Sequence, residues 1–221
     1  MSAVFRSLFM DSSSAGHTGG VGDLLSSLPD VQDWRDAAAV GWFDGDAGLA
    51  EGFAEAAEGI FDLWQSGSHP NDRLLLPLIY NYRHAWELAL KQAIREAAAR
   101  IRFDGNAEFE LYPENLEAHL KCKQSHRLGP LAQQLSGLLE RLSLGGLPAG
   151  TMKVLAQMQQ LDPRGEAFRY AHHLNTTATH VDVPALVKLF REVFGLIHGG
   201  VLTELYVHEE FQRELREAFA E

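Results

Sequence analysis

Apolar residues recur with a helical period along most of the chain from about residue 50 onward. In EGFAEAAEGIFDLWQ, residues 51–65, the apolar side chains fall at three- and four-residue spacings, which is the pattern of an amphipathic α-helix. The members of this predicted stripe are Phe53, Ala56, Ala57, Ile60, Phe61 and Trp64. The segment SGSHPND ends the pattern, and Asn71 or Asp72 is placed to cap the next helix.

The next pattern predicts a long helix over about residues 74–102. Apolar positions cover most of its circumference, which is typical of the central helix of a bundle. Pro77 is acceptable there because it lies near the first turn. The stretch FDGNAEFELYP, residues 103–113, breaks the helical period, and we expect a short hairpin around it.

Three more helices are expected downstream. SHRLGPLAQQLSGLLERL, residues 125–142, and LPAGTMKVLAQMQQLD, residues 147–162, both keep the helical period. The last and long helix begins with Asp182 as its cap and Pro184 in its first turn, and Gly199-Gly200 either interrupts it or allows close packing. With no alternation of helix and strand, the sequence predicts an all-α bundle with a long central helix and a long C-terminal helix.

The domain organisation follows from the same patterns. Residues 1–50 are predicted to be a partly flexible N-terminal extension, because residues 11–33 are rich in Ser, Gly and Asp. Residues 51–221 are predicted to be one helical domain.

Composition narrows the function classes. The chain has 221 residues, 46% of them hydrophobic and 22% charged, and no apolar run long enough to cross a bilayer, so we expect a cytoplasmic protein without a membrane partner. The net charge is −11, from 19 basic and 30 acidic residues. Since nucleic-acid binding depends on neutralised phosphates, any RNA contact must be local or be made through a partner. The lone Cys122 excludes an intramolecular disulfide.

The stretch NYRHAWELALK, residues 81–91, concentrates candidate chemistry. On a helix, Arg83, Glu87 and Lys91 follow at four-residue spacings along one edge, and His84 lies on the next edge. Two interpretations stay open: these are polar groups satisfied by a neighbouring element, or they line a cleft in an apolar bundle. Arg169 either pairs with Glu87 or a main-chain carbonyl, or completes a polar cluster with Arg83, His84 and His126.

Three motifs in order carry a family resemblance. LLLPLIYNYRHAWELALKQAI, the later SHRLGPL and then LDPRGEAFRYA together resemble prokaryotic HEPN-like proteins (higher eukaryotes and prokaryotes nucleotide-binding). The resemblance covers roughly residues 53 to 205. The matching positions are Tyr82, Arg83, His84, Glu87, Leu88, Leu90, Lys91, His126, Leu128, Asp162, Pro163, Phe168, Arg169 and Tyr170.

The resemblance implies a helical bundle that is often dimeric and is frequent in bacterial defence and toxin–antitoxin systems. Active members of the group are metal-independent ribonucleases with an Arg-x(4–6)-His motif near a dimer groove. In such a site the Arg stabilises charge on the phosphate, and the His moves the proton of the RNA 2′-hydroxyl. No cofactor and no metal are therefore expected.

One stretch of this chain fits that motif, Arg191-EVFGLI-His198. Seven residues make nearly two helical turns, so the two side chains are expected to share a face. They lie off the apolar stripe of the same helix, and we expect them to be exposed or to be buried by another chain. Arg191 and His198 are the predicted catalytic pair.

Three functions follow from these features. The first is a HEPN-like effector that acts on RNA in bacterial defence or stress, either by metal-independent endoribonuclease activity or by binding RNA. This effector is expected to be a homodimer. The second is a non-catalytic HEPN-like module that dimerises and scaffolds a partner protein encoded alongside it. The third is a nucleotide-sensing module that uses the cleft around Arg83 and His84.

Overall fold

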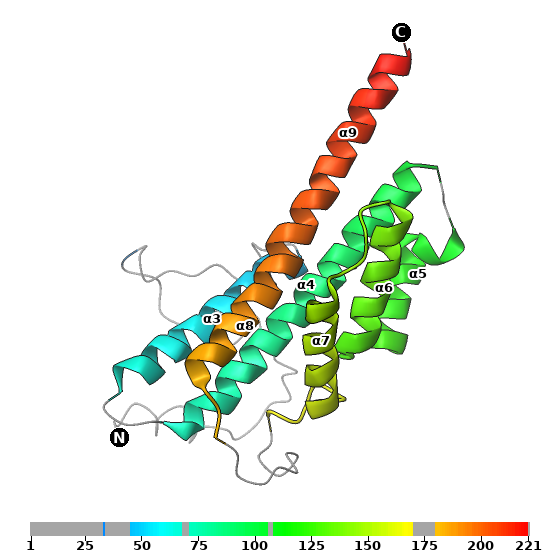
Figure 1. Cartoon of the computed structure of the whole chain (residues 1–221). Helices are drawn as coiled ribbons and strands as arrows, with labels where there is room; N and C mark the ends of the chain where they lie inside the picture. The colour runs from blue at the N-terminus through cyan, green and yellow to red at the C-terminus, as the bar shows by residue number, and fades with distance from the viewer. Residues whose placement is uncertain (1–32, 34–44, 68–70, 106–107, 170–179, 221) are drawn as a thin grey trace. The chain divides into compact units, whose positions relative to one another are not determined.

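The computed structural model describes residues 33, 45–67, 71–105, 108–169 and 180–220, and every regular element in these ranges is helical. The predicted all-α class is therefore confirmed. The α-helices carry the labels of Figure 1 and are α3 (Asp46–Ser66), α4 (Leu75–Phe103), α5 (Pro113–His119), α6 (Leu128–Arg141), α7 (Ala149–Leu161), α8 (Val183–Phe194) and α9 (Leu202–Ala220). None of the described helices combines the length and the apolar character needed to span a bilayer.

The helix α4 is the central element, as its sequence pattern predicts (Figure 1). It packs against α3, α6, α8 and α9, and its apolar side chains are buried around most of its circumference. Trp86 is fully buried, and its indole Nε1 donates a hydrogen bond to the carbonyl of Phe190 on α8 at 3.3 Å. This bond satisfies the one polar atom of a large aromatic side chain inside the core.

The helix α3 lies along α4 and begins at Asp46, inside the extension expected for residues 1–50; most of that extension lies outside the described residues. Ala57 and Phe61 of the predicted stripe are buried, and Phe53, Ile60 and Trp64 are partly buried against the core. Ala56 is exposed, and Ala50 and Ala54 take its place in the buried face. The small alanines allow α3 to approach α4 closely. The predicted cap also forms, because the Asn71 side chain accepts a hydrogen bond from Arg73 N ahead of α4.

The prediction of a short hairpin after α4 is wrong. The described part of that segment forms a 3-10 turn, Phe109–Leu111, followed by α5 and a π-helical turn, Leu120–Gln124. Pro113 occupies the first turn of α5, where its missing N–H costs nothing. The carbonyl of Leu111 accepts from Arg102 of α4, so a side chain rather than a partner strand satisfies this backbone group. The hydrophobic pattern loses its helical period in this segment because the segment consists of short, irregular helical turns, not because it contains strands.

The C-terminal segment forms one continuous helical rod (Figure 1). Asp182 caps α8 as predicted, since its side chain accepts from Ala185 N at 3.0 Å. Gly199-Gly200 falls in a π-helical segment, Gly195–Val201, that joins α8 to α9 without ending the helix. The widened i→i+5 turn keeps the backbone hydrogen-bonded through the glycines, so the rod is wider at this point but is not broken.

Candidate functional site

A buried ionic network occupies the contact between α4 and the loop after α7. Arg83 and Glu87 of α4 and Asp162 of the loop are each at most 2% exposed. Arg83 Nη1 donates to Glu87 Oε2 at 3.0 Å, and Arg83 Nε lies 2.7 Å from Asp162 Oδ2, an ion pair without hydrogen-bond alignment. Arg83 Nη2 also donates to the carbonyl of His126. Charges this deeply buried are tolerated only when they are paired in this way.

Two further side chains, a lysine and a histidine, contact Glu87. Lys91 Nζ lies 2.8 Å and His126 Nδ1 2.9 Å from Glu87 Oε1. Burial alone would raise the pKa of Glu87, but the hydrogen bond and charge of Lys91, with the charges of His126 and Arg83, hold that pKa below its usual value. Glu87 is thus a carboxylate that links α4 to the start of α6.

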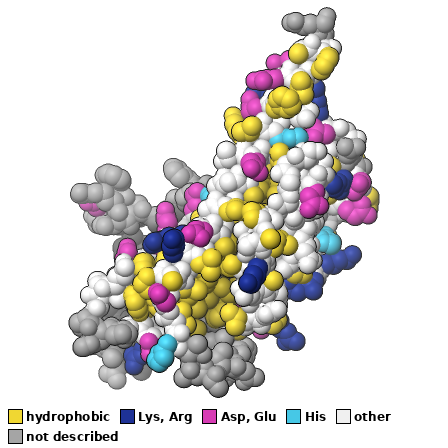
Figure 2. Space-filling model, in the orientation of Figure 1, with side chains coloured by type: hydrophobic (Ala, Val, Ile, Leu, Met, Phe, Trp, Pro, Cys, Tyr) yellow, Lys and Arg dark blue, Asp and Glu magenta, His cyan; other side chains and the backbone are white. Residues whose placement is uncertain are grey.

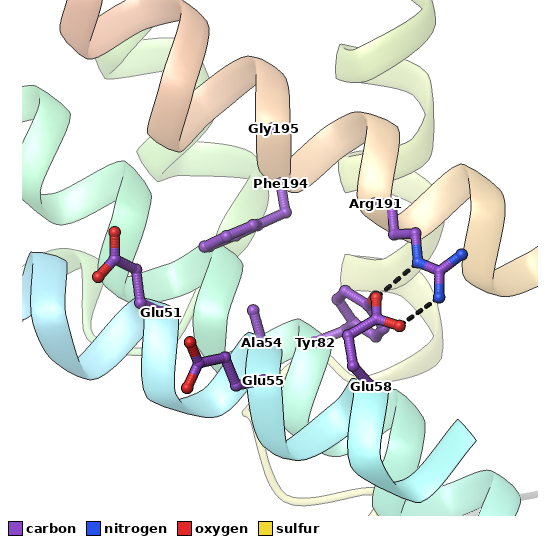
Figure 3. Close-up of a pocket in the computed structure, with 8 residues that line it drawn as sticks. All are labelled: Glu51, Ala54, Glu55, Glu58, Tyr82, Arg191, Phe194 and Gly195. Carbon is purple, nitrogen blue, oxygen red and sulfur yellow. Dashed lines mark hydrogen bonds and ion pairs between the residues drawn. The ribbon is translucent and has the colours of Figure 1, made fainter. Parts of the chain in front are cut away.

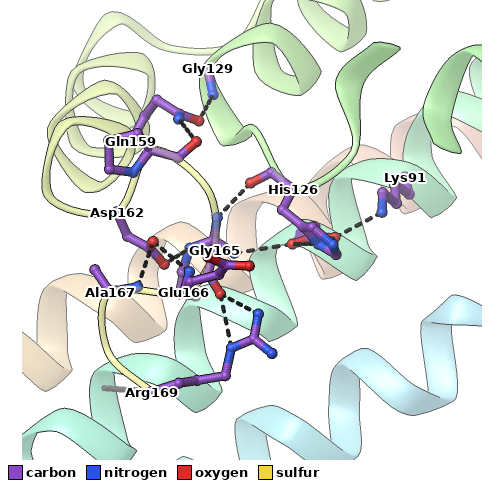
Figure 4. Close-up of polar contacts among 12 residues, drawn as sticks. Lys91, His126, Gly129, Gln159, Asp162, Gly165, Glu166, Ala167 and Arg169 are labelled. Atoms are coloured by element: carbon purple, nitrogen blue, oxygen red, sulfur yellow. Dashed lines mark hydrogen bonds and ion pairs between the residues drawn. The ribbon is translucent and has the colours of Figure 1, made fainter. Parts of the chain in front are cut away.

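The loop that follows α7 is folded around Asp162 and Gly165 (Figure 4). Asp162 Oδ1 accepts from the backbone N–H groups of Glu166, at 2.7 Å, and Ala167, at 2.9 Å. Gly165 has φ +78°, and a Cβ at this position would lie 2.9 Å from His126 Cβ and 3.2 Å from Arg83 Nη2. Backbone conformation and close packing therefore both require glycine here.

Arg169 matches the first interpretation left open by the sequence, an anchor bonded to a main-chain carbonyl. Among the described contacts, its guanidinium has none with Arg83, His84 or His126. Its guanidinium donates to a main-chain carbonyl, that of Gly165, from Nη2 at 2.9 Å and from Nε at 3.2 Å. Through Gly165 it closes the loop over Arg83 and His126. Its Cζ also lies 5.9 Å from the centroid of the Tyr80 ring, a cation–π distance. Arg169 is therefore an anchor of the loop at the rim of the network.

His84 lies beside the network in an aromatic contact. Its ring stacks on Tyr80, with centroids 6.0 Å apart, and meets the edge of Phe53 of α3 at 4.3 Å. Burial lowers the pKa of His84, because the charged imidazolium would lose hydration there.

The interpretation as satisfied polar groups describes Arg83 and Glu87 better than the interpretation as a cleft. Every charged group of the pair has a partner, and neither side chain is open to a ligand. In contrast, His126 is half exposed and lies at the edge of the network. Sequence reasoning named Asp162 only as a position of the LDPR motif and did not predict its pairing with Arg83. An acid directly after a helix and before Pro163 was the available signal, but its contact with Arg83 spans more than seventy residues.

Both residues of the predicted catalytic pair contact glutamates of α3, and Figure 3 shows the contact of Arg191. Arg191 is bound by Glu58 in a two-bond arrangement, with Nε donating to Oε1 at 2.6 Å and Nη2 to Oε2. His198 Nε2 lies 3.7 Å from Glu51 Oε1, and the imidazole stacks on Phe194. Glu51 and Glu58 are seven residues apart, as are Arg191 and His198, so the two segments match in antiparallel order. The expectation of exposure fits Arg191, which is half exposed; His198 is 17% exposed and is covered by its own chain.

A pocket of about 320 Å³ opens between these two contacts. Figure 3 shows its lining residues, which are Glu51, Ala54, Glu55, Glu58, Tyr82, Arg191, Phe194 and Gly195. The hydrogen bond from Arg191 lowers the pKa of Glu58, whose other contact is the Tyr82 hydroxyl. With three carboxylates around one guanidinium, the local field is negative and opposes an approaching phosphate.

Comparisons with protein-family models, with curated proteins and with solved structures found no match to this chain. The HEPN-like resemblance accordingly rests on the three motifs. Among the described residues, no group of three or more His, Cys, Asp or Glu side chains is placed to hold a metal ion.

Proposed function

We propose that this chain is a cytoplasmic, HEPN-like helical module that works by binding a partner protein. The three motifs and the helical bundle around α4 support the family assignment. The observation that carries the binding role is the exposed apolar surface of α9. The C-terminal part of α9 projects beyond the other described helices, and its last turns are largely exposed (Figure 1).

The exposed apolar side chains of α9 are large. Phe211 is 56% and Phe219 87% exposed, and Tyr206 and Val207 are exposed as well. Figure 2 shows hydrophobic and acidic side chains next to one another along the projecting helix. Clustered apolar side chains on one surface element are a mark of protein–protein contact sites.

The state of the cationic residues also favours binding over catalysis. Arg83 is enclosed by Glu87, Asp162 and a carbonyl group, and Arg191 is held by Glu58. An arginine that stabilises a reacting phosphate needs N–H groups directed at the substrate. In this chain, Arg83 directs N–H groups at Glu87 and at a backbone carbonyl, and Arg191 directs two of its N–H groups at Glu58.

The binding role can be tested with the full chain immobilised and exposed to an extract of its source organism. The retained proteins are compared for wild type, Phe211→Ser and the matched control Phe109→Ser, which removes a phenylalanine outside α9 that is even more exposed than Phe211. We expect Phe211→Ser to lose a protein that wild type and the control retain. If wild type retains nothing specific and light scattering finds it monomeric at all concentrations, the binding role is refuted.

A second candidate is metal-independent RNA cleavage by Arg191 and His198. One observation favours it: both side chains face the same side of α3, and Arg191 is half exposed. A second copy or an RNA phosphate would have to displace Glu58 to free the guanidinium. Homodimerisation, which the family resemblance implies, is part of this candidate.

Purified protein incubated with total RNA and EDTA tests the second candidate. Cleavage by wild type that disappears in Arg191→Ala/His198→Ala, and increases in Glu58→Gln, would support it, because Glu58→Gln removes the competing charge. Cleavage that is equal in wild type and the double variant would assign the activity to other residues. No cleavage by wild type or by Glu58→Gln would exclude this candidate.

A further inference from the structure

One row of apolar residues on α9 has the geometry of a helix-packing surface. Val207, Phe211, Leu215 and Phe219 follow at four-residue spacings, and this set is named the α9 row. Residues at i, i+4 and i+8 form the ridge that fits into the groove of another helix. An elongated helical occupant therefore matches this surface better than a small molecule does.

A hollow of about 470 Å³ lies at the base of the α9 row. Val207 and Phe211 of the row form one wall, and Ser143 and Leu144, from the turn after α6, form the opposite wall. Glu204 also lines the hollow. A large apolar side chain of an incoming helix can insert between the two walls, which is how an anchor residue holds a helix in a groove.

The other side of α9 is already occupied. Arg216 Nη2 donates to the carbonyl of Phe103 at 2.8 Å and lies 3.2 Å from Asp104 Oδ1, and its guanidinium covers the Phe103 ring at 3.9 Å. Arg100 of α4 pairs with Glu209. These contacts fix α9 on the end of α4. Among the described residues, Val207, Phe211 and Phe219 of the α9 row stay exposed, and Leu215 is partly covered.

The charges beside the α9 row define the chemistry of the occupant. Glu210 and Glu214 each follow a row residue by three positions, and Glu217 follows Glu214 by three, so together they form the acidic edge. Arg213 pairs with Glu210. Within the described residues, no cation lies at ion-pairing distance from Glu214, Glu217 or Glu204. Glu214 and Glu217 of the acidic edge thus present uncompensated negative charge beside an apolar ridge.

We infer that the α9 row and its acidic edge bind a basic amphipathic helix of a partner protein, an inference that rests on the binding role proposed above. The apolar face of such a helix covers the row, and its Lys or Arg side chains meet the acidic edge. A second copy fits less well, because antiparallel pairing brings two acidic edges together. Parallel pairing places each acidic edge against His208 and Gln212, and His208 already contacts Asp104. An anionic membrane surface or an RNA is repelled by the same edge.

The direct test uses two designed, labelled helical peptides with the same Leu and Phe ridge, one flanked by Lys and the other by Glu. Fluorescence anisotropy with the full chain should give about tenfold tighter binding of the Lys peptide at low salt, a preference that shrinks at high salt. Phe211→Ser should abolish binding, whereas Phe109→Ser should not change it. Glu214→Gln/Glu217→Gln should reduce the preference to about threefold or less. The equal charge change Glu114→Gln/Glu192→Gln, on other exposed glutamates, should leave it unchanged.

Several outcomes would overturn the inference. Equal binding of the two peptides removes the role of the acidic edge, and no binding of either removes the site. A dimer found by light scattering and broken by Phe211→Ser makes a second copy the occupant. If the extract experiment retains a partner through Phe211 but the Lys peptide binds no more tightly than the Glu peptide, the proposed binding role stands. Only the inference that the partner helix is basic is then refuted. If Phe211→Ser changes neither experiment, both proposals fall.

Discussion

Gly165 is a residue at which the loop after α7 leaves no space for a side chain. Its φ of +78° disfavours L-residues, and an added Cβ would lie 2.9 Å from His126 Cβ. Gly145 has a similar φ, +76°, but nothing lies within 4 Å of its Cβ position. We expect Gly165→Ala to lower the free energy of unfolding by about 3 kcal/mol and Gly145→Ala by about 1 kcal/mol, because only the first adds a steric overlap to the backbone strain. Urea unfolding measures both, and equal losses would mean that the loop yields easily.

Asp162 compensates the charge of a buried arginine and caps the same loop. Asp162→Ala should destabilise the protein by about 3 kcal/mol, since it removes one partner of a buried pair and two acceptor bonds. Asp162→Asn keeps an acceptor oxygen and should cost about half as much. Glu166→Ala, at an exposed side chain in the same loop, is the control and should stay within about 0.5 kcal/mol of wild type. A loss below that limit for Asp162→Ala would show that Arg83 finds sufficient compensation in Glu87.

Contacts that are local in the chain were predictable at the residue scale, and distant ones were not. Asp182 could be assigned as a cap because it bonds Ala185, three residues away. The sequence also placed Arg83, Glu87 and His126 in one polar group, but it left their burial open. The pairing of Arg83 with Asp162, and of Arg191 with Glu58, depends on how helices pack, and no residue spacing encodes it.

At the scale of elements, α9 depends on a few contacts with the end of α4. Arg216→Ala removes the bond to the Phe103 carbonyl and the contact with the Phe103 ring. We expect amide hydrogen exchange in the last two turns of α9 to speed up about fivefold, a loss of about 1 kcal/mol of local stability. Arg213→Ala serves as the control, because Arg213 pairs only with Glu210 of the same helix among the described residues. Unchanged exchange in Arg216→Ala would mean that α9 is held elsewhere.

Helix periodicity predicted the long elements well and their junctions poorly. The expected helix over residues 74–102 is observed at Leu75–Phe103, because a period sustained for many turns leaves little freedom in its assignment. The hairpin failed for the opposite reason, since a few irregular turns carry no period of their own. The π-helical segment at Gly195–Val201 was also not predictable, because its glycines are equally compatible with a helix end.

At the scale of the whole molecule, two electrostatic effects act in opposite directions as the pH falls. The net charge of −11 diminishes, which relieves repulsion within the folded chain. Against this, the pKa values of Glu58, Glu87 and Glu117 are lowered in the folded state. A carboxyl with a lowered pKa stabilises the fold above its unfolded pKa, near 4.5, and this contribution is lost as the pH drops through the folded value.

At higher pH, His84 also contributes to the pH dependence of the free energy of unfolding, and this contribution can be isolated experimentally. Its pKa is lowered by burial, so between the unfolded value of 6.5 and the folded value the unfolded chain binds the extra proton. Wild type should therefore lose stability as the pH falls below 6.5, relative to His84→Phe, which keeps an aromatic ring between Tyr80 and Phe53. Urea unfolding of both proteins at about pH 7.5 and about pH 5.5 measures this contribution. The effect of the falling net charge is common to the two proteins, so it cancels in the difference between them. A larger loss in His84→Phe than in wild type would mean that the folded site accepts the imidazolium, and that His84 is open to solvent or to a nearby carboxylate.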